Sequence, residues 1–194
     1  GERGLTLHQL IAGTSTIVVG TTIATNSIVS KTGARCCMVT TKGFRDMLEL
    51  SSRIPKDDPY DLRVSPPQYL VPRYLRFEVE ERIQFDGRVI TPLNREDVDR
   101  AVRKAKEHKV DVPVVCFLHS YMNPQHEEEA AEMIRAEFPN VVISSHILRK
   151  RMEGYRFHTA VLAGYVFIQI ANFVGKLEQY LKSESFKGTL LFST

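Results

Sequence analysis

The chain has 194 residues, of which 43% are hydrophobic and 25% are charged, and its formal net charge is +3. These values are ordinary for a globular protein with one sizeable domain or two small ones. The charge is too small to indicate a protein that binds nucleic acid or an anionic membrane, so we expect neither among its partners.

The three cysteines, Cys36, Cys37 and Cys116, lie in apolar runs and form no CxxC pair. An odd number with two adjacent members favours buried free thiols over a disulfide framework, and therefore a reducing compartment. No signal peptide and no apolar run of membrane-spanning length is apparent. We therefore expect a cytoplasmic protein.

In chain order, the first expected strand is "STIVV" at 15–19, which runs into Gly20-Thr21-Thr22 and a helical pattern over 24–33. A second buried strand over 34–41 precedes an amphipathic stretch over 43–53. Prolines at 55, 59, 66, 67 and 72 predict a long surface excursion over 53–77. We expect "FEVEERIQFDGRVI", at 77–90, to form a polar hairpin that turns at Asp86-Gly87.

Alternation of helix and strand then resumes. The stretch 92–110 predicts a helix with Asn94 as its N-cap and Asp97 at N3. A buried strand over 112–121 follows, and then a helix over 123–138 with Asn123 as N-cap and Pro124 at N1. We expect a strand over 140–148, a long and largely apolar helix over 152–186, and a last strand over 188–194.

Strands that alternate with helices and are apolar throughout predict an α/β fold with a mainly parallel sheet. Ligands of such sheets bind beyond the carboxyl ends of the strands. The predicted strands end in small polar residues at 20–22, 40–43, 119–123 and 144–146. We therefore expect the strand tips to converge into one wall of a hydroxyl-lined crevice.

The "GTT" of residues 20–22 has two interpretations. Glycine lets a phosphate approach the backbone, threonine hydroxyls donate, and a helix start adds free N–H groups. Alternatively, Thr22 or Thr25 only caps the helix. Asn26 is either solvated or a contact into the crevice. No GxxxxGK[ST] and no GxGxxG occurs, which disfavours P-loop and classical Rossmann sites.

The histidines carry weaker signals. His119 and His146 follow strands, where an acid/base or metal role competes with that of a hydrogen-bonded loop residue, and no third metal ligand stands at a typical spacing. We expect His126, beside three glutamates, to be solvated. Residues 149–156 read as a charged surface segment, although Arg156 could enter the crevice. No nucleophile–base pair and no catalytic carboxylates can be assigned.

Several blocks of the sequence occur in a specific order: "GTTIATN" at 20–26, "GAR" at 33–35, "VTT" at 39–41 and "GFRD" at 43–46. They continue in "VPR" at 71–73, "ERIQFDG" at 81–87, "VCFLHSYMNPQHE" at 115–127 and "ISSHI" at 143–147. In these blocks the chain resembles the hydantoinase A / 5-oxoprolinase family. That family includes ATP-dependent N-methylhydantoinases and the ATP-binding subunits of acetone and acetophenone carboxylases.

The resemblance implies a ribonuclease-H-like lobe of the acetate-kinase/Hsp70/actin superfamily, with a mixed, mainly parallel sheet and flanking helices. It implies an N-terminal domain over 1–148 and the start of a second domain over 149–194. The first phosphate loop of the family, Asp-x-Gly-Gly-Thr, does not occur, and Ala163-Gly164 stand where the family tends to have Asn-Ala. The chain therefore reads as a partial lobe, inactive as an isolated piece.

The implied activity is hydrolysis of a cyclic amide, or carboxylation of a ketone, through phosphorylation of a carbonyl, amide or bicarbonate oxygen. ATP and Mg²⁺ are implied as cofactors. The implied partners are a small-molecule substrate and the rest of the polypeptide or another subunit, in a homo- or hetero-oligomer. The alternative is a non-catalytic lobe that serves subunit assembly, which the long apolar helix favours.

We expect two groups of residues to contact nucleotide or substrate. Gly20, Thr21, Thr22, Thr25 and Asn26 form the first group, and Thr40, Thr41, Arg45 and His119 form the second. Arg45 either anchors an anionic group or pairs with Asp46 or Glu49 at the surface.

Overall fold

The computed structural model describes residues 4, 6–51 and 68–193. Its contacts divide the chain into two compact units, a first unit of Gly1–Gly33 with Val166–Thr194 and a second unit of Ala34–Tyr165. The boundary at 148/149 was expected from the family resemblance and not from contacts within the chain, and it stays a prediction. Most of the expected proline-rich excursion, over 52–67, lies outside the described residues.

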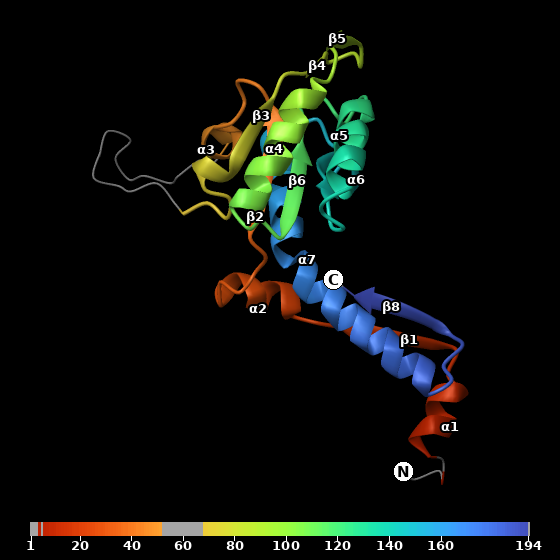
Figure 1. The fold of residues 1–194 in the computed structure, drawn as a ribbon. Helices are drawn as coiled ribbons and strands as arrows, with labels where there is room; N and C mark the ends of the chain where they lie inside the picture. The colour runs from red at the N-terminus through yellow and green to blue at the C-terminus, as the bar shows by residue number, and fades with distance from the viewer. Residues whose placement is uncertain (1–3, 5, 52–67, 194) are drawn as a thin grey trace, which may run out of the picture. The chain divides into compact units, whose positions relative to one another are not determined.

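The second unit contains a parallel four-stranded sheet in the order β3-β2-β6-β7 (Figure 1). Its strands are β2 (Cys36–Thr41), β3 (Arg76–Val79), β6 (Val112–Cys116) and β7 (Val142–Ile143). Every residue of β2 and β6 is buried, as apolar runs in central parallel strands require. The predicted α/β architecture with a mainly parallel sheet is therefore confirmed.

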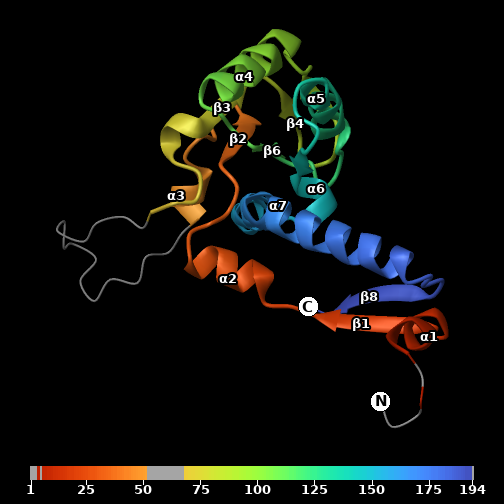
Figure 2. The ribbon, with the colours of Figure 1, turned by 60° about the horizontal axis from the view of Figure 1, so that its bottom comes forward.

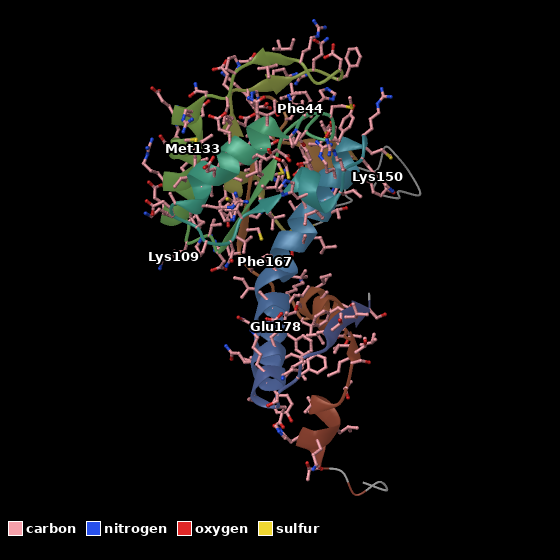
Figure 3. The ribbon with its side chains drawn as sticks, turned by 90° about the vertical axis from the view of Figure 1, so that its right-hand side faces the viewer. Phe44, Lys109, Met133, Lys150, Phe167 and Glu178 are labelled. Carbon is pink, nitrogen blue, oxygen red and sulfur yellow. The ribbon has the colours of Figure 1, made fainter. Side chains whose placement is uncertain are left out.

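Helices α4 (Arg95–Glu107) and α5 (Gln125–Arg135) pack together on one side of this sheet. The first half of α7 (Glu153–Ser183) packs against the strands at Gly164. A Cβ atom there would lie 2.7 Å from Val114 Cγ2, so only glycine fits without a shift of the strand. Figure 3 shows how the side chains of the unit fill the space around the strands, with Met133 labelled on α5.

Three short helices complete the second unit, namely α3 (Met47–Ser51), the 3-10 helix η1 (Arg73–Leu75) and α6 (Ser144–Ile147). The predicted hairpin exists as β4 (Arg82–Ile83) and β5 (Val89–Thr91), and its turn contains Gly87 with a φ of +89°. Arg76–Val79 was expected in the excursion and the hairpin, but it forms the edge strand β3. The alternation of buried Phe77 and Val79 with exposed Glu78 explains this correction.

Pro113 lies inside the central strand β6, where a proline normally removes a ladder hydrogen bond. The neighbouring Val112 N–H donates to Arg35 O on the β2 side. Because N–H groups alternate in direction along a strand, the position of Pro113 faces β7, whose pairing begins only at Val114. The missing N–H therefore costs no ladder bond.

The helix starts test the capping predictions. Asn94 caps α4 as predicted, since its side chain accepts from Asp97 N–H at 3.2 Å. The prediction for α5 is off by one residue, because Pro124 is the N-cap and Asn123 Oδ1 accepts from Gln125 N–H at 3.1 Å.

The first unit contains α1 (Leu7–Ala12), β1 (Thr16–Gly20), α2 (Ile23–Val29), β8 (Thr189–Ser193) and the second half of α7. Strand β1 pairs in parallel with β8 in a sheet of only two strands, which lies beside this half of α7 (Figure 2). Its paired residues Val18 and Leu191 are 64% and 49% exposed. The prediction of a buried first strand is therefore wrong, because one face of this sheet is bare.

Among the described residues, α7 is the one helix long and apolar enough to cross a membrane by length and composition. This corrects the expectation that no apolar run reaches that length. Only 28% of its most apolar window is buried within the structure. The same composition suits a core helix, and Phe157, Ala160 and Val161 are buried in the second unit.

Candidate functional site

The strand order of the second unit places a topological switch point between β2 and β6. The chain goes from β2 to β3 on one side, and then continues through β6 to β7 on the other. Open parallel sheets bind ligands beyond the carboxyl ends of the strands at such a point. The residues at this place are Thr40 and Thr41 at the end of β2 and the segment 117–120 after β6.

Thr41 belongs to a closed, buried network rather than to an open loop. Its hydroxyl donates to Glu81 Oε1 and accepts from Leu118 N–H at 3.0 Å. The second oxygen of Glu81 lies 2.7 Å from His126 Nδ1. Thr41, Glu81 and His126 are all at most 3% exposed, so His126 is not solvated as expected. The network joins the ends of two strands to the start of α5.

A second network ties β6, β7 and α7 together around the fully buried Glu127. Its Oε1 accepts from Phe117 N–H at 2.8 Å and from the Ser144 hydroxyl at 2.6 Å, and its Oε2 accepts from Ser145 N–H at 3.0 Å. Buried carboxylates need partners of this kind. Glu127 stands in the first turn of α5, where a negative charge suits the helix dipole, and it is an interior residue.

Arg156 extends this second network, and it is fully buried instead of lying at the surface. Its guanidinium donates to Phe117 O at 2.6 Å and to Ser144 Oγ at 3.0 Å, and it pairs with Glu153. Burial raises the pKa of Glu153, against the opposing effect of Arg156. The expected alternative that Arg156 enters an open crevice is thus corrected, because its donors are engaged inside.

His119 is the switch-point residue with an unusual backbone. Its φ is +56°, and its N–H donates to Glu153 Oε1 at 2.9 Å. Its Nδ1 lies 3.6 Å from the same oxygen and makes no hydrogen bond within the described chain. Burial lowers the pKa of the imidazole, and the positive charges of Arg82 and Arg156 add to this effect. His119 is therefore a neutral, partly exposed imidazole near neutral pH.

Three buried hydroxyls near the carboxyl ends of the strands have no hydrogen-bond partner among the described residues: those of Thr40, Ser120 and Ser145. Each residue is at most 6% exposed. A buried hydroxyl without a partner is costly, so such groups normally have a use. Together with His119 they are the polar groups that a ligand at the switch point could engage.

Residues 20–26 lie in the first unit, whereas the switch point lies in the second. Thr22 is the N-cap of α2 by position, but its side chain makes no capping bond. Instead, the Thr21 hydroxyl accepts from Ile23 N–H at 3.2 Å, and Asn26 Nδ2 donates to Thr22 Oγ1 at 3.3 Å. Gly20 has no positive φ, and a Cβ atom there would meet nothing within 4 Å. Nothing in the described chain therefore requires a glycine at this position.

These placements divide the predicted residues between the two units. The predicted residues Thr40, Thr41 and His119 meet at one end of the second unit's sheet. Gly20, Thr21, Thr22, Thr25 and Asn26 are exposed or solvent-facing residues of the first unit. The tip of β1 belongs to a different sheet, because β1 pairs with β8 and not with β2. Their roles in binding stay predictions.

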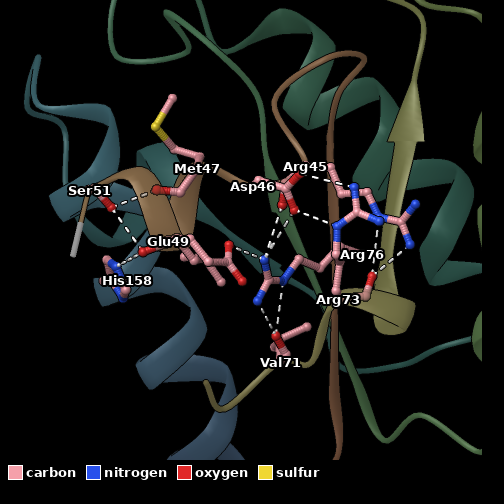
Figure 4. A network of polar contacts seen from close by, with 10 residues as sticks. Arg45, Asp46, Met47, Glu49, Ser51, Val71, Arg73, Arg76 and His158 are labelled. Atoms are coloured by element: carbon pink, nitrogen blue, oxygen red, sulfur yellow. Dashed lines mark hydrogen bonds and ion pairs between the residues drawn. The ribbon is translucent and has the colours of Figure 1, made fainter. Parts of the chain in front are cut away.

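Arg45 has neither of the ion pairs that the sequence suggested. Its Nε and Nη2 donate to Arg73 O at 3.2 and 2.9 Å. Asp46 instead forms a two-bond ion pair with Arg73, at 2.7 and 3.0 Å, and Glu49 pairs with the buried Arg76 (Figure 4). The side-chain hydrogen bond to Arg73 lowers the pKa of Asp46.

The other titratable groups offer little chemistry. All three cysteines are buried and free, and burial raises the pKa of Cys36 to about 12. They are inert thiols, as the sequence predicted. Within the described ranges, no three histidine, cysteine, aspartate or glutamate side chains are grouped so that they could hold a metal ion. His146 is exposed and lies 3.5 Å from Glu128.

Comparison with known proteins identifies relatives of the whole chain. Residues 6–138 match the profile of the hydantoinase/oxoprolinase N-terminal region. A protein of Methanocaldococcus jannaschii is 36% identical over 178 residues, which are 89% of this chain and 26% of that protein. The caprolactamase subunit alpha of Pseudomonas jessenii is 32% identical over 90% of this chain and 26% of the subunit. The acetophenone carboxylase gamma subunit of Aromatoleum aromaticum is 30% identical over 97% of this chain and 28% of that subunit.

Two solved structures are similar throughout. The ATP-dependent caprolactamase from Pseudomonas jessenii matches 98% of this chain and 28% of its own, with 27% identity and a TM-score of 0.86. The nucleotide-free acetone carboxylase matches 97% of this chain and 29% of its own, with 25% identity and a TM-score of 0.83. The chain thus spans little more than a quarter of the length of these relatives.

Proposed function

The chain belongs to the hydantoinase/oxoprolinase family, and on this premise we propose that it forms part of an ATP-dependent enzyme. The enzyme phosphorylates a carbonyl, amide or bicarbonate oxygen, and thereby hydrolyses a cyclic amide or carboxylates a ketone. The observation that carries the proposal is the similarity of nearly the whole chain to an ATP-dependent caprolactamase. Carboxylase subunits among the relatives support the second reaction and a partner subunit.

The chemistry explains why ATP is needed. An amide or a bicarbonate is a poor electrophile, and phosphorylation of its oxygen supplies a good leaving group. Catalysis of phosphoryl transfer depends mainly on positioning and on neutralising charge, and not on a strong nucleophile. The absence of an assigned nucleophile–base pair is therefore compatible with this reaction.

We assign Gly20, Thr21, Thr22, Thr25 and Asn26 to the nucleotide or the substrate. Gly20 is exposed and has open space where a Cβ atom would be, so a ligand can approach its backbone. The exposed hydroxyls beside it can donate to phosphate oxygens. ATP supplies the phosphoryl group, and Mg²⁺ enters with its phosphates, since Mg²⁺ needs few protein ligands there. Thr40, Thr41 and His119 belong to the switch point. Of these three side chains, those of Thr40 and His119 have polar atoms without a hydrogen-bond partner among the described residues.

The first unit supports a finer proposal for the fold, a ribonuclease-H-like lobe completed by further polypeptide. Parallel sheets are normally covered on both faces, and two strands alone are marginally stable. The β1–β8 sheet has two strands and a bare face with Val18 and Leu191. Further strands would pair with its open edges and a further layer would cover this face, from the rest of the polypeptide or from another subunit. We place the assembly in the cytoplasm, where free thiols persist.

The same bare sheet favours the second candidate function, a non-catalytic lobe that serves assembly. Light scattering measures the oligomeric state of the chain, alone and with the remaining polypeptide, and distinguishes the assembly function from the enzymatic one. A monomer that binds an ATP analogue unaided contradicts the assembly function. A chain that is soluble only in complex, and that contributes nothing to ATP hydrolysis, supports it.

The test of the enzymatic proposal uses the full-length protein and a panel of hydantoin, 5-oxoproline, caprolactam and acetone. We expect one of these compounds to stimulate ATP hydrolysis, and Thr22→Ala with Asn26→Ala to abolish the stimulation. Thr16→Ala, at the other end of β1, is the matched control and leaves the rate unchanged. An unstimulated wild type, or a double variant with normal rates, refutes the proposal.

A further inference from the structure

A cleft of about 290 Å³ lies in the second unit between the edge strand β3 and helix α4. Arg45, Arg100 and Lys104 line it, together with the carboxylates Glu78, Asp97 and Glu107. We call it the β3–α4 cleft. It involves neither residues 20–26 nor the switch-point residues 117–120, and Arg45 is the one residue that it shares with those expected from the sequence to contact nucleotide or substrate.

Two of the three carboxylates that line the β3–α4 cleft, those of Glu78 and Asp97, are engaged by the protein. Glu78 Oε1 accepts from Gly43 N–H at 2.8 Å. Asp97 Oδ2 accepts from Glu80 N–H at 3.0 Å, and its Oδ1 pairs with Arg100 at 2.8 Å. These bonds engage three of the four oxygens of these two carboxylates and hold them in place.

Arg45 and Lys104, in contrast, have no carboxylate partner among the described residues. The carboxylates nearest to Arg45 in sequence are occupied, because Asp46 pairs with Arg73 and Glu49 pairs with Arg76 (Figure 4). Two hydrogen bonds to Arg73 O hold the Arg45 guanidinium in place and leave Nη1 uncommitted. A guanidinium that is fixed in this way loses little entropy when it binds an anion.

We propose that the β3–α4 cleft binds a small molecule that carries an oxyanion, a carboxylate or a phosphate. Arg45 supplies a preorganised donor from the loop after β2, and Lys104 supplies a mobile positive charge from α4. Charge-assisted hydrogen bonds of this kind are among the strongest that side chains make. The volume is at the small end of ligand sites, which suits a small metabolite better than a nucleoside triphosphate.

The test is equilibrium dialysis of the full-length protein with labelled inorganic phosphate and, in a second arm, labelled citrate, against chloride at matched ionic strength. We expect saturable binding of one of the two anions, and the arm that binds identifies the ligand as phosphate or carboxylate. Lys104→Gln should weaken it about tenfold, as the loss of one charge-assisted bond implies. Arg45→Gln should weaken it at least as much.

Arg103→Gln is the matched control, because Arg103 precedes Lys104 on α4, is exposed and does not line the cleft. Arg103→Gln should leave the dissociation constant within about twofold of the wild-type value, because salt screens the interaction of the anion with an exposed charge outside the cleft. Thr22→Ala with Asn26→Ala should also leave it unchanged, which separates this site from the proposed nucleotide site. No binding above chloride, or equal losses in the Lys104 and Arg103 variants, overturns the proposal.

Discussion

At the scale of single residues, the interior of the second unit depends on polar side chains that the sequence marks poorly. Glu127 satisfies two backbone N–H groups and one hydroxyl at the ends of β6 and β7. The sequence places it in a run of glutamates at a helix start, which normally indicates solvent. Its partners lie 10 to 18 residues away, and no local spacing rule connects them. The pair of Glu81 and His126, 45 residues apart, was missed for the same reason.

His119 gives a prediction about pH. Burial, Arg82 and Arg156 lower its pKa in the folded protein below its ordinary value of 6.5. At a pH between the pKa of the folded protein and that of the unfolded chain, His119 binds more protons in the unfolded chain. The stability that the neutral imidazole contributes is therefore present above pH 6.5 and is lost as the pH falls through the folded pKa. His119→Asn removes this titration, and asparagine tolerates the positive φ.

We therefore expect the free energy of unfolding of the wild type to fall relative to that of His119→Asn as the pH falls from about 7.5 to about 5. Urea unfolding at several pH values measures it. His146→Asn is the control for the substitution itself, because it makes the same change at an exposed histidine. Parallel pH profiles for wild type and His119→Asn would contradict the expected direction.

At the scale of elements, propensity and pattern predicted most helices and strands, and burial decided where the prediction failed. "STIVV" and "RCCMVTT" look alike as apolar runs, yet β2 is buried and β1 is partly exposed. The difference lies in which elements cover each strand, and a run of five residues carries no information about that. The candidate site follows the same pattern. Thr41 and His119 were found because they stand at strand ends, whereas Glu81 was not found and Arg156 was expected in an open crevice instead of the interior.

Helix α7 allows a matched test of packing. A Cβ atom at Gly164 would lie 2.7 Å from Val114 Cγ2 and 3.3 Å from Cys36 Sγ, whereas one at Gly175 would meet nothing within 4 Å. We expect Gly164→Ala to destabilise the protein by about 1–3 kcal/mol through overpacking. Gly175→Ala should stabilise it by about 0.5–1 kcal/mol through helix propensity. Urea unfolding followed by circular dichroism measures both, and a gain at position 164 would show that α7 does not pack this closely.

At the scale of the whole molecule, the two units differ in how completely they are built. The second unit has a four-stranded sheet with two fully buried strands and an interior network of hydrogen-bonded polar side chains. The first unit has two paired strands with open edges, and its helices α1 and α2 have six and seven residues. Short helices and two-stranded sheets have little stability of their own.

This asymmetry predicts unequal protection from hydrogen exchange in the 194-residue chain. Amides of β2 and β6 should exchange at least about 100-fold more slowly than those of β1 and β8, because local opening of two exposed strands costs far less than opening a buried sheet. Exchange measured by mass spectrometry on peptides from residues 16–20 and 36–41 gives the comparison directly. In the full-length protein, the proposed additional strands should slow exchange in β1 and leave β2 unchanged. Equal protection of β1 and β2 in the short chain would mean that the two-stranded sheet is stable alone, and it would remove the reason to expect further strands at its edges.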